Sequence, residues 1–182
     1  IGILGRKAAL ETINKRLVTE LAFRDQIAVL QEWVPRLRPH VDVLILLAHE
    51  GVAGMQSTTA EQDKQRRLDT DIEVACSVPG IDVLITGHAH RGVETPIVVE
   101  PTGTLLVSTY GMGTRLGELV LELDPESLQI TEHRGRLIPV MAADIPADPD
   151  MEQLILKWEK RVNEIAGEVI GTATIPLTRN YH

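Results

Sequence analysis

The sequence predicts an α/β domain of the mixed (α+β) kind, with parallel strands first and antiparallel hairpins after them. Two nearly continuous apolar runs, residues 41–48 and 81–86, read as buried strands and are separated by a helical segment. After Gly92, short strands alternate with tight turns. The chain has 182 residues, 43% of them apolar, which is enough for the core of one ordinary domain.

The first forty residues contain a short strand and one clear helix. Residues 1–5 are strand-like, whereas residues 6–22 show no clean period and are predicted as loop, with a helix left open. Residues 25–38 form an amphipathic helix, since apolar side chains recur at steps of three and four: Ile27, Leu30, Val34 and Leu37. Pro35 should kink this helix or end it early.

The two buried strands should be parallel neighbours. A loop is expected over residues 50–58, then a polar helix that begins at the capping-box pair Thr58 and Glu61 and ends near residue 78. A strand–helix–strand unit makes a right-handed crossover between parallel strands. Both strands therefore end at the carboxyl edge of one sheet, where open α/β sheets place their ligands.

The second half of the chain should be built from hairpins and one helix. Five short strands are predicted, at residues 97–100, 104–109, 118–124, 129–134 and 136–140. An acidic, proline-containing linker follows at residues 142–150, and then a helix that ends at Gly167. Its apolar stripe is made by Leu154, Ile155, Trp158, Val162 and Ile165. Residues 169–177 resemble a strand without a partner.

Charge and composition exclude several classes of partner. Asp and Glu total 26 against 18 Lys and Arg, a net charge of −8, and no basic block occurs, so a nucleic-acid polymer is not expected as partner. No apolar run approaches the roughly 20 residues of a membrane span. The single cysteine, Cys76, cannot form an intrachain disulfide. A small anionic substrate remains compatible, because a metal ion can supply positive charge locally.

Three histidines form the candidate site. His88 and His90 stand in G-H-x-H directly after one buried strand, and His49 ends the other. Neutral imidazole is the commonest metal ligand in proteins, so we predict that all three bind metal. Taken alone, His49 could equally be a packing residue at a strand end. The neighbouring Arg91 could contact an anionic substrate, although most such arginines are simply solvated.

Carboxylate ligands are harder to find. Phosphate-ester hydrolysis usually employs two metals about 3.5–4 Å apart, which need bridging carboxylates. Asp42 and Asp82 each begin a strand, roughly 20 Å from the histidines, and Glu50 is poorly placed to bridge. The carboxylates should therefore come from outside this chain. His40, His133 and His182 are assigned no role.

Three segments together resemble the distal half of a calcineurin-like metallophosphoesterase domain. They are L-I-L-L-A-H-E-G (44–51), L-I-T-G-H-A-H (84–90) and Y-G-M-G-T-R-L-G-E-L-V-L-E-L-D (110–124). The branch they resemble comprises 5′-nucleotidases and 2′,3′-cyclic-nucleotide phosphodiesterases. The resemblance implies half of a four-layer β-sandwich with flanking helices, around two divalent metal ions of the Zn, Mn, Mg or Fe class. By motif, His49 and His88 would hold one ion and His90 the other.

The resemblance also implies a division of the chain and a missing part. Residues 1–142 would be the C-terminal half of the metallophosphoesterase domain, 143–168 a linker with an interdomain helix, and 169–182 the first strand of a truncated C-terminal substrate domain. The family's D-x-H, G-D and G-N-H-[DE] blocks do not occur here, so the chain itself supplies no catalytic residue. We expect the full-length protein to hydrolyse nucleotides or related phosphate esters as a periplasmic or extracellular enzyme, and this piece alone to be inactive.

Two other functions remain open. A thiosulfohydrolase of sulfur oxidation shares the same architecture and would release sulfate instead of phosphate. A metal-binding or metal-free α/β module could also serve as an interaction domain without catalysis. Carboxylate ligands in the segment preceding Ile1 would separate the enzymes from the interaction module.

Overall fold

The computed structural model describes residues 1–50 and 68–175, and the chain divides into two compact units, Ile1–Pro139 and Val140–His182. Within the described residues the first unit holds a five-stranded sheet and a two-stranded one. The first sheet has the order β1 (Gly2–Leu4), β2 (Ile45–His49), β3 (Val83–Thr86), β5 (Thr104–Ser108) and β4 (Ile97–Val99). The second is the hairpin of β6 (Arg115–Leu123) and β7 (Ile130–Pro139).

The strands of the first sheet are mostly parallel, and the later pair is antiparallel. β1, β2, β3 and β5 run parallel to one another, and β4 forms the edge of the sheet, antiparallel to β5. β6 and β7 pair antiparallel over nearly their whole length. The prediction of a mixed α/β fold, with parallel strands followed by an antiparallel hairpin, is thus confirmed.

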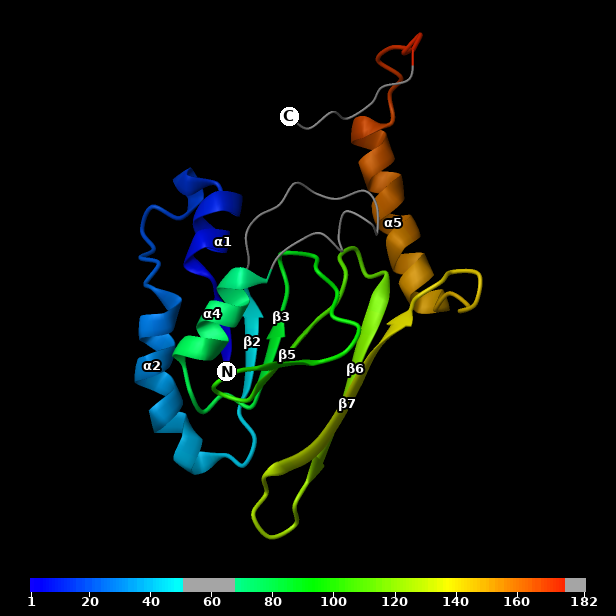
Figure 1. Cartoon of the computed structure of the whole chain (residues 1–182). Helices are drawn as coiled ribbons and strands as arrows, with labels where there is room; N and C mark the ends of the chain where they lie inside the picture. The colour runs from blue at the N-terminus through cyan, green and yellow to red at the C-terminus, as the bar shows by residue number, and fades with distance from the viewer. Residues whose placement is uncertain (51–67, 176–182) are drawn as a thin grey trace. The chain divides into compact units, whose positions relative to one another are not determined.

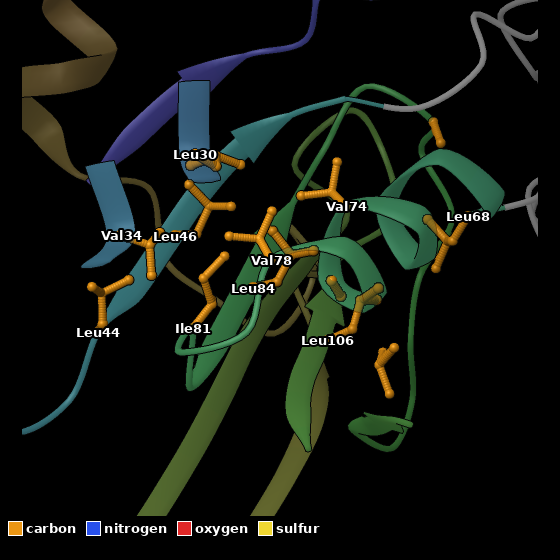
Figure 2. Packing of buried hydrophobic residues seen from close by; sticks show 13 residues of the cluster. Leu30, Val34, Leu44, Leu46, Leu68, Val74, Val78, Ile81, Leu84 and Leu106 are labelled. Carbon is orange, nitrogen blue, oxygen red and sulfur yellow. The ribbon is translucent and has the colours of Figure 1, made fainter. Parts of the chain in front are cut away.

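Two helices cover one face of the first sheet. α2 (Gln26–Leu37) begins at Asp25, whose side chain accepts a hydrogen bond from the amide of Ala28, and α4 (Asp69–Ser77) lies beside it (Figure 1). Apolar side chains from both helices meet those of the strands (Figure 2). The largest fully buried side chains of this core are Leu30, Val34, Val78, Leu46, Leu84 and Leu106.

The other face of the sheet is apolar but only partly covered. Side chains alternate along a strand, so Ile45, Leu47 and Ile85 point away from the helices, and they are 39%, 54% and 39% exposed. The hairpin approaches this face over β3 and β5 and leaves a cavity of about 320 Å³, lined by Ile85, Val107 and hairpin residues such as Leu119. Parallel strands are normally buried on both faces, so a partly exposed apolar face is unusual for such a sheet.

Several local predictions need correction. Residues 6–22, predicted as loop with a helix left open, contain a helix, α1 (Arg6–Thr12), and a 3₁₀ turn, Lys15–Leu17. Pro35 lies in the last turn of α2, which continues to Leu37, since a proline there removes only one hydrogen bond. The predicted strands 129–134 and 136–140 are a single strand running through Gly135. The Thr58–Glu61 helix start lies outside the described residues.

The prediction that the strand at 104–109 pairs only as a hairpin is wrong. β5 does form a hairpin with β4, but it also lies parallel to β3. The connection from β3 to β5 contains the histidine loop and the edge strand β4 in place of a crossover helix. An irregular connection of this length is sufficient to bring the chain back in the same direction.

The second unit contains α5 (Pro149–Ala166), close to its predicted bounds. Asp148 caps it by accepting hydrogen bonds from the amides of Asp150 and Met151, and Gly167 follows its last residue. Residues 169–175 form no strand, contrary to expectation. A strand needs a partner for its backbone groups, and none pairs with it in the part of the chain described here. No helix among the described residues is long and apolar enough to cross a membrane.

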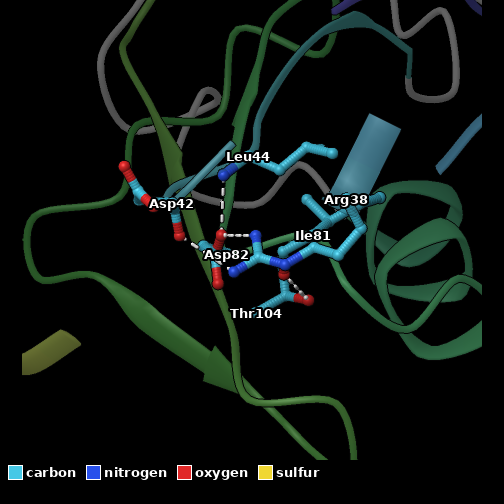
Figure 3. Close-up of polar contacts among 6 residues, drawn as sticks. All are labelled: Arg38, Asp42, Leu44, Ile81, Asp82 and Thr104. Carbon is cyan, nitrogen blue, oxygen red and sulfur yellow. Dashed lines mark hydrogen bonds and ion pairs between the residues drawn. The ribbon is translucent and has the colours of Figure 1, made fainter. Parts of the chain in front are cut away.

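An ion pair joins the starting ends of the central strands (Figure 3). The Asp82 carboxylate, just before β3, accepts hydrogen bonds from the Arg38 guanidinium and from the Leu44 amide at 2.6 Å. Arg38 also donates to the Asp42 carbonyl at 2.9 Å. Thr104, at the start of β5, donates to the Ile81 carbonyl at 2.8 Å. These contacts set the register in which the strands begin.

We predict that Asp82→Ala destabilises the protein by about 1–3 kcal/mol, because it leaves the Leu44 amide and Arg38 without their charged acceptor. Urea denaturation at neutral pH measures the change. Asp42→Ala is the matched control: Asp42 occupies the same place in the similar sequence V-D-V-L-I but lies three residues before β2, and its carbonyl accepts the hydrogen bond from Arg38. Equal effects of the two substitutions would contradict the assigned role.

Candidate functional site

His49 and His88 meet at the carboxyl edge of the sheet. His49 is the last residue of β2, and His88 follows β3 after Gly87. Because Ala48 pairs with Thr86 in the parallel ladder, the two strands end side by side. His88 Nδ1 lies 3.1 Å from His49 Nε2, and the ring centroids are 4.8 Å apart. The sequence predicted this meeting from strand order alone.

The loop that presents His88 and His90 has an unusual backbone. Both histidines adopt positive φ angles, 71° and 54°, which non-glycine residues seldom do. The Ala89 amide between them donates to the Gly87 carbonyl at 2.9 Å, and the Gly87 amide donates to the Ala48 carbonyl at 3.1 Å. Such conformations persist only where surrounding contacts fix them, and they cluster at functional sites.

His90 packs against a second loop, residues 110–114. A Cβ added to Gly111 would overlap the His90 ring, and one added to Gly92 would lie 2.5 Å from the Tyr110 ring. The Tyr110 hydroxyl donates to Glu94 at 3.0 Å, which ties the two loops together. Within the described residues, His90 does not join His49 and His88 in a group able to hold one metal ion.

Positive charge lies close to this second loop. The Arg115 guanidinium is 6.0 Å from the centroid of the Tyr110 ring. Burial raises the pKa of Tyr110, as does its hydrogen bond to Glu94, while the charges of Arg91 and Arg115 oppose the rise. Arg91, named from the sequence as a possible contact for an anion, therefore has a second arginine near the same tyrosine.

Two buried carboxylates lie beneath the histidine pair, and sequence reasoning missed one of them. Asp71 of α4 is fully buried and its Oδ1 accepts a hydrogen bond from the Thr86 hydroxyl. The pKa of Asp71 is raised to about 6, chiefly by burial; the Thr86 hydrogen bond opposes this rise and the charge of Glu50 adds to it. Glu50 is itself only 2% exposed and packs against Gly5.

A sequence signal for Asp71 did exist. Asp71, Val74, Ala75 and Val78 recur at helical steps of three and four, so Asp71 occupies a position on the apolar face of α4. A carboxylate in the apolar stripe of a helix is costly to bury unless it is hydrogen-bonded and paired, which makes such a residue notable. The polar composition of the rest of this helix concealed the pattern.

The His49–His88 pair fits a shared metal ion. Two imidazole nitrogens bound to one tetrahedral zinc at about 2.0–2.1 Å lie roughly 3.3 Å apart, close to the 3.1 Å between His88 Nδ1 and His49 Nε2. No group of three or more His, Cys, Asp and Glu residues able to hold a metal occurs in the described ranges 1–50 and 68–175. The pair can thus supply two ligands, and a complete centre needs further ones.

Comparison with known proteins extends this picture. No family model matches the chain. It is 25% identical to bovine (Bos taurus) 5′-nucleotidase over 97% of its own length, but it spans only 31% of that relative. Among solved structures it resembles the Thermus thermophilus sulfate thiohydrolase SoxB, with a TM-score of 0.71, 22% identity, and coverage of 90% of this chain and 27% of that one. It also resembles the Bacillus subtilis calcineurin-like phosphoesterase YfkN, with a TM-score of 0.65, 20% identity, and coverage of 92% and 52%.

We predict that Gly111→Ala destabilises the protein by about 1–3 kcal/mol, because the added methyl group forces the His90 ring out of its place. Thermal unfolding of the metal-free protein measures the effect. Gly2→Ala is the control, since a Cβ there meets only the Leu47 carbonyl oxygen at 4.0 Å. If the two variants unfold alike, the two loops do not pack as described.

We also predict a pH signature for Asp71. Its folded pKa, about 6, lies above the ordinary 3.8, so the folded chain binds the proton more tightly than the unfolded chain. Its contribution to stability is therefore fully present below about pH 4 and is lost as the pH rises through 6, a change on the order of 1–3 kcal/mol.

The measurement is urea unfolding of wild type and Asp71→Asn between pH 4 and 7.5, with a chelator present. The stability of Asp71→Asn relative to wild type should rise with pH. Glu73→Gln removes an exposed carboxylate from the same helix and should show no such trend. A pH-independent difference between wild type and Asp71→Asn would contradict the assignment.

Proposed function

From relatives that are 5′-nucleotidases and calcineurin-like phosphoesterases, as the motif resemblance predicted, we propose that the full-length protein is a metal-dependent phosphoester hydrolase acting on nucleotides. The observation that carries the proposal is the His88 Nδ1–His49 Nε2 distance of 3.1 Å at the carboxyl edge of a parallel sheet. His49 and His88 would be ligands of one divalent cation, and His90 a ligand of a second.

In the absence of metal, the contact between His49 and His88 constrains how a cation can bind. When His49 and His88 hydrogen-bond to each other, one nitrogen carries the shared proton and the other accepts it. A cation between them requires both lone pairs, so the shared proton must first move to the other nitrogen of its ring. When bound, divalent metal supplies Lewis acidity toward phosphoryl oxygens and lowers the pKa of coordinated water.

The arginines suit an anionic substrate. Arg91 follows His90 directly, and both Arg91 and Arg115 influence Tyr110 across the two loops. In a chain of net charge −8, two guanidinium groups beside the candidate ligands favour an anion at this edge. Nucleotide phosphate is the anion that the proposal assigns to them.

The remaining parts of the enzyme are proposed to lie outside this chain. The chain spans about a third of its curated relatives, at 31% of the bovine enzyme. Bridging carboxylates, the catalytic acid–base group and a nucleotide-binding domain would come from the other two thirds. We accordingly propose that the 182-residue chain alone is inactive, and that the whole protein works in the periplasm or outside the cell.

The experiment uses the full-length protein with a divalent cation and compares phosphate release from nucleoside monophosphates with sulfate release from a thiosulfate ester. Phosphate release is expected to dominate. His49→Ala and His88→Ala should each lower kcat/KM about 10²-fold or more, because each removes a metal ligand. His133→Ala on β7 is the matched control and should retain wild-type activity.

Three outcomes would redirect the assignment. Sulfate release without phosphate release favours the thiosulfohydrolase, and neither activity favours the interaction module. Full turnover by the 182-residue chain would contradict its proposed inactivity.

A further inference from the structure

Asp71 and Thr86 form a buried polar contact directly behind the histidine loop. Asp71 is 0% exposed and Thr86 is 6% exposed, and the Thr86 hydroxyl donates to Asp71 Oδ1. Thr86 is the last residue of β3, and only Gly87 separates it from His88. The contact thus joins helix α4 to the point where β3 ends and the loop begins.

The burial of Asp71 that this contact requires lowers the stability of the folded chain. Asp71 Oδ2 is buried and has no hydrogen-bond partner among the described residues. An unsatisfied buried carboxylate oxygen destabilises a folded protein, and an apolar side chain on this face of α4 would remove the penalty. The other buried members of the face, Val74, Ala75 and Val78, are all apolar. A buried carboxylate that lowers stability on this apolar face suggests that Asp71 has a role other than stabilising the core.

The backbone beyond Thr86 shows what that role can be. The Gly87 amide donates to the Ala48 carbonyl, and His88 then turns into the left-handed region with φ of 71°. A strained turn is stable only if the chain on either side of it is held. On the β3 side, the Thr86 side chain is anchored to Asp71, which fixes the residue from which the turn departs.

We propose that Asp71 is a positioning residue that acts through Thr86 to hold the histidine loop, and with it the ring of His88 against His49. Asp71 touches neither substrate nor metal in this scheme. The consequence for metal binding rests on the proposed function, whereas the consequence for the loop backbone does not. The two can therefore be measured separately.

The first experiment is amide hydrogen exchange in the metal-free protein at pH 7.5. In Asp71→Asn, the Gly87 and Ala89 amides should exchange about tenfold faster or more, because their hydrogen bonds depend on the loop position. Amides earlier in β3, such as that of Leu84, should stay as in wild type. Glu73→Gln, an exposed carboxylate on the same helix, is the control and should change none of them.

Variants of Thr86 provide an independent test in case Asp71→Asn does not fold. Thr86→Val removes the hydroxyl at nearly constant volume and should produce the same faster exchange, whereas Thr86→Ser keeps the hydroxyl and should restore wild-type rates. The double variant Asp71→Asn with Thr86→Val should be no worse than either single one, since both remove one contact. Additive effects would overturn the proposal.

The second experiment titrates the full-length protein with Zn²⁺ alone, in competition with a chromophoric chelator. Asp71→Asn should bind Zn²⁺ about 10–100-fold more weakly than wild type, the usual effect of losing a group that orients a metal ligand. Above pH 6 it should nevertheless be at least as stable to urea, because the buried charge is gone. A purely structural role would lower stability and metal affinity together.

The possible outcomes distinguish a failure of the positioning role of Asp71 from a failure of the proposed metal-dependent function. Wild-type exchange at Gly87 and Ala89 in both Asp71→Asn and Thr86→Val would overturn the positioning role. If exchange accelerates as expected but the full-length wild-type protein binds no Zn²⁺, the positioning role stands and the proposed metal-dependent function fails.

Discussion

The parallel register between β2 and β3 is the constraint on which the candidate site depends. Ile45 pairs with Val83 and Ala48 with Thr86, so both strands stop at the same level. A slip of one residue would turn every side chain of one strand to the opposite face. It would expose Leu46 or Leu84 and separate His49 from His88. The same register therefore buries the core of the sheet and brings the two histidines together.

Sequence patterns predicted these strands because both of their faces carry apolar side chains, which leaves a strong, continuous apolar signal. They also predicted the meeting of His49 and His88, since strand order alone brings carboxyl ends together. The parallel pairing of β5 with β3 escaped prediction, because it depends on how the helix-free connection folds back. The contact between His90 and Gly111 escaped for a similar reason: two loops meet across the sheet edge, and no local pattern encodes their approach.

The hairpin shows how small residues set the distance between two sheets. Gly117 and Gly135 belong to the hairpin face that lines the cavity over β3 and β5. A Cβ at Gly135 would lie 2.7 Å from the Pro96 ring, and one at Gly117 would lie 3.2 Å from the Thr109 methyl group. The missing side chains let the hairpin approach closely at these points, while Leu119 and Leu137 span the wider space between them. Close approach at these glycines keeps the second sheet near the strands that carry the histidine loop.

The two ends of the sheet have opposite energetic character. At the amino end, Asp82, Arg38 and the Leu44 amide satisfy one another, and the register is set by favourable contacts. At the carboxyl end lie the residues that cost stability: two histidines at positive φ and the buried Asp71. A fold selected only for stability would have no reason to gather these costs at one edge. These costs lie at the edge where parallel sheets bind ligands, which supports the metal-binding role proposed for His49 and His88.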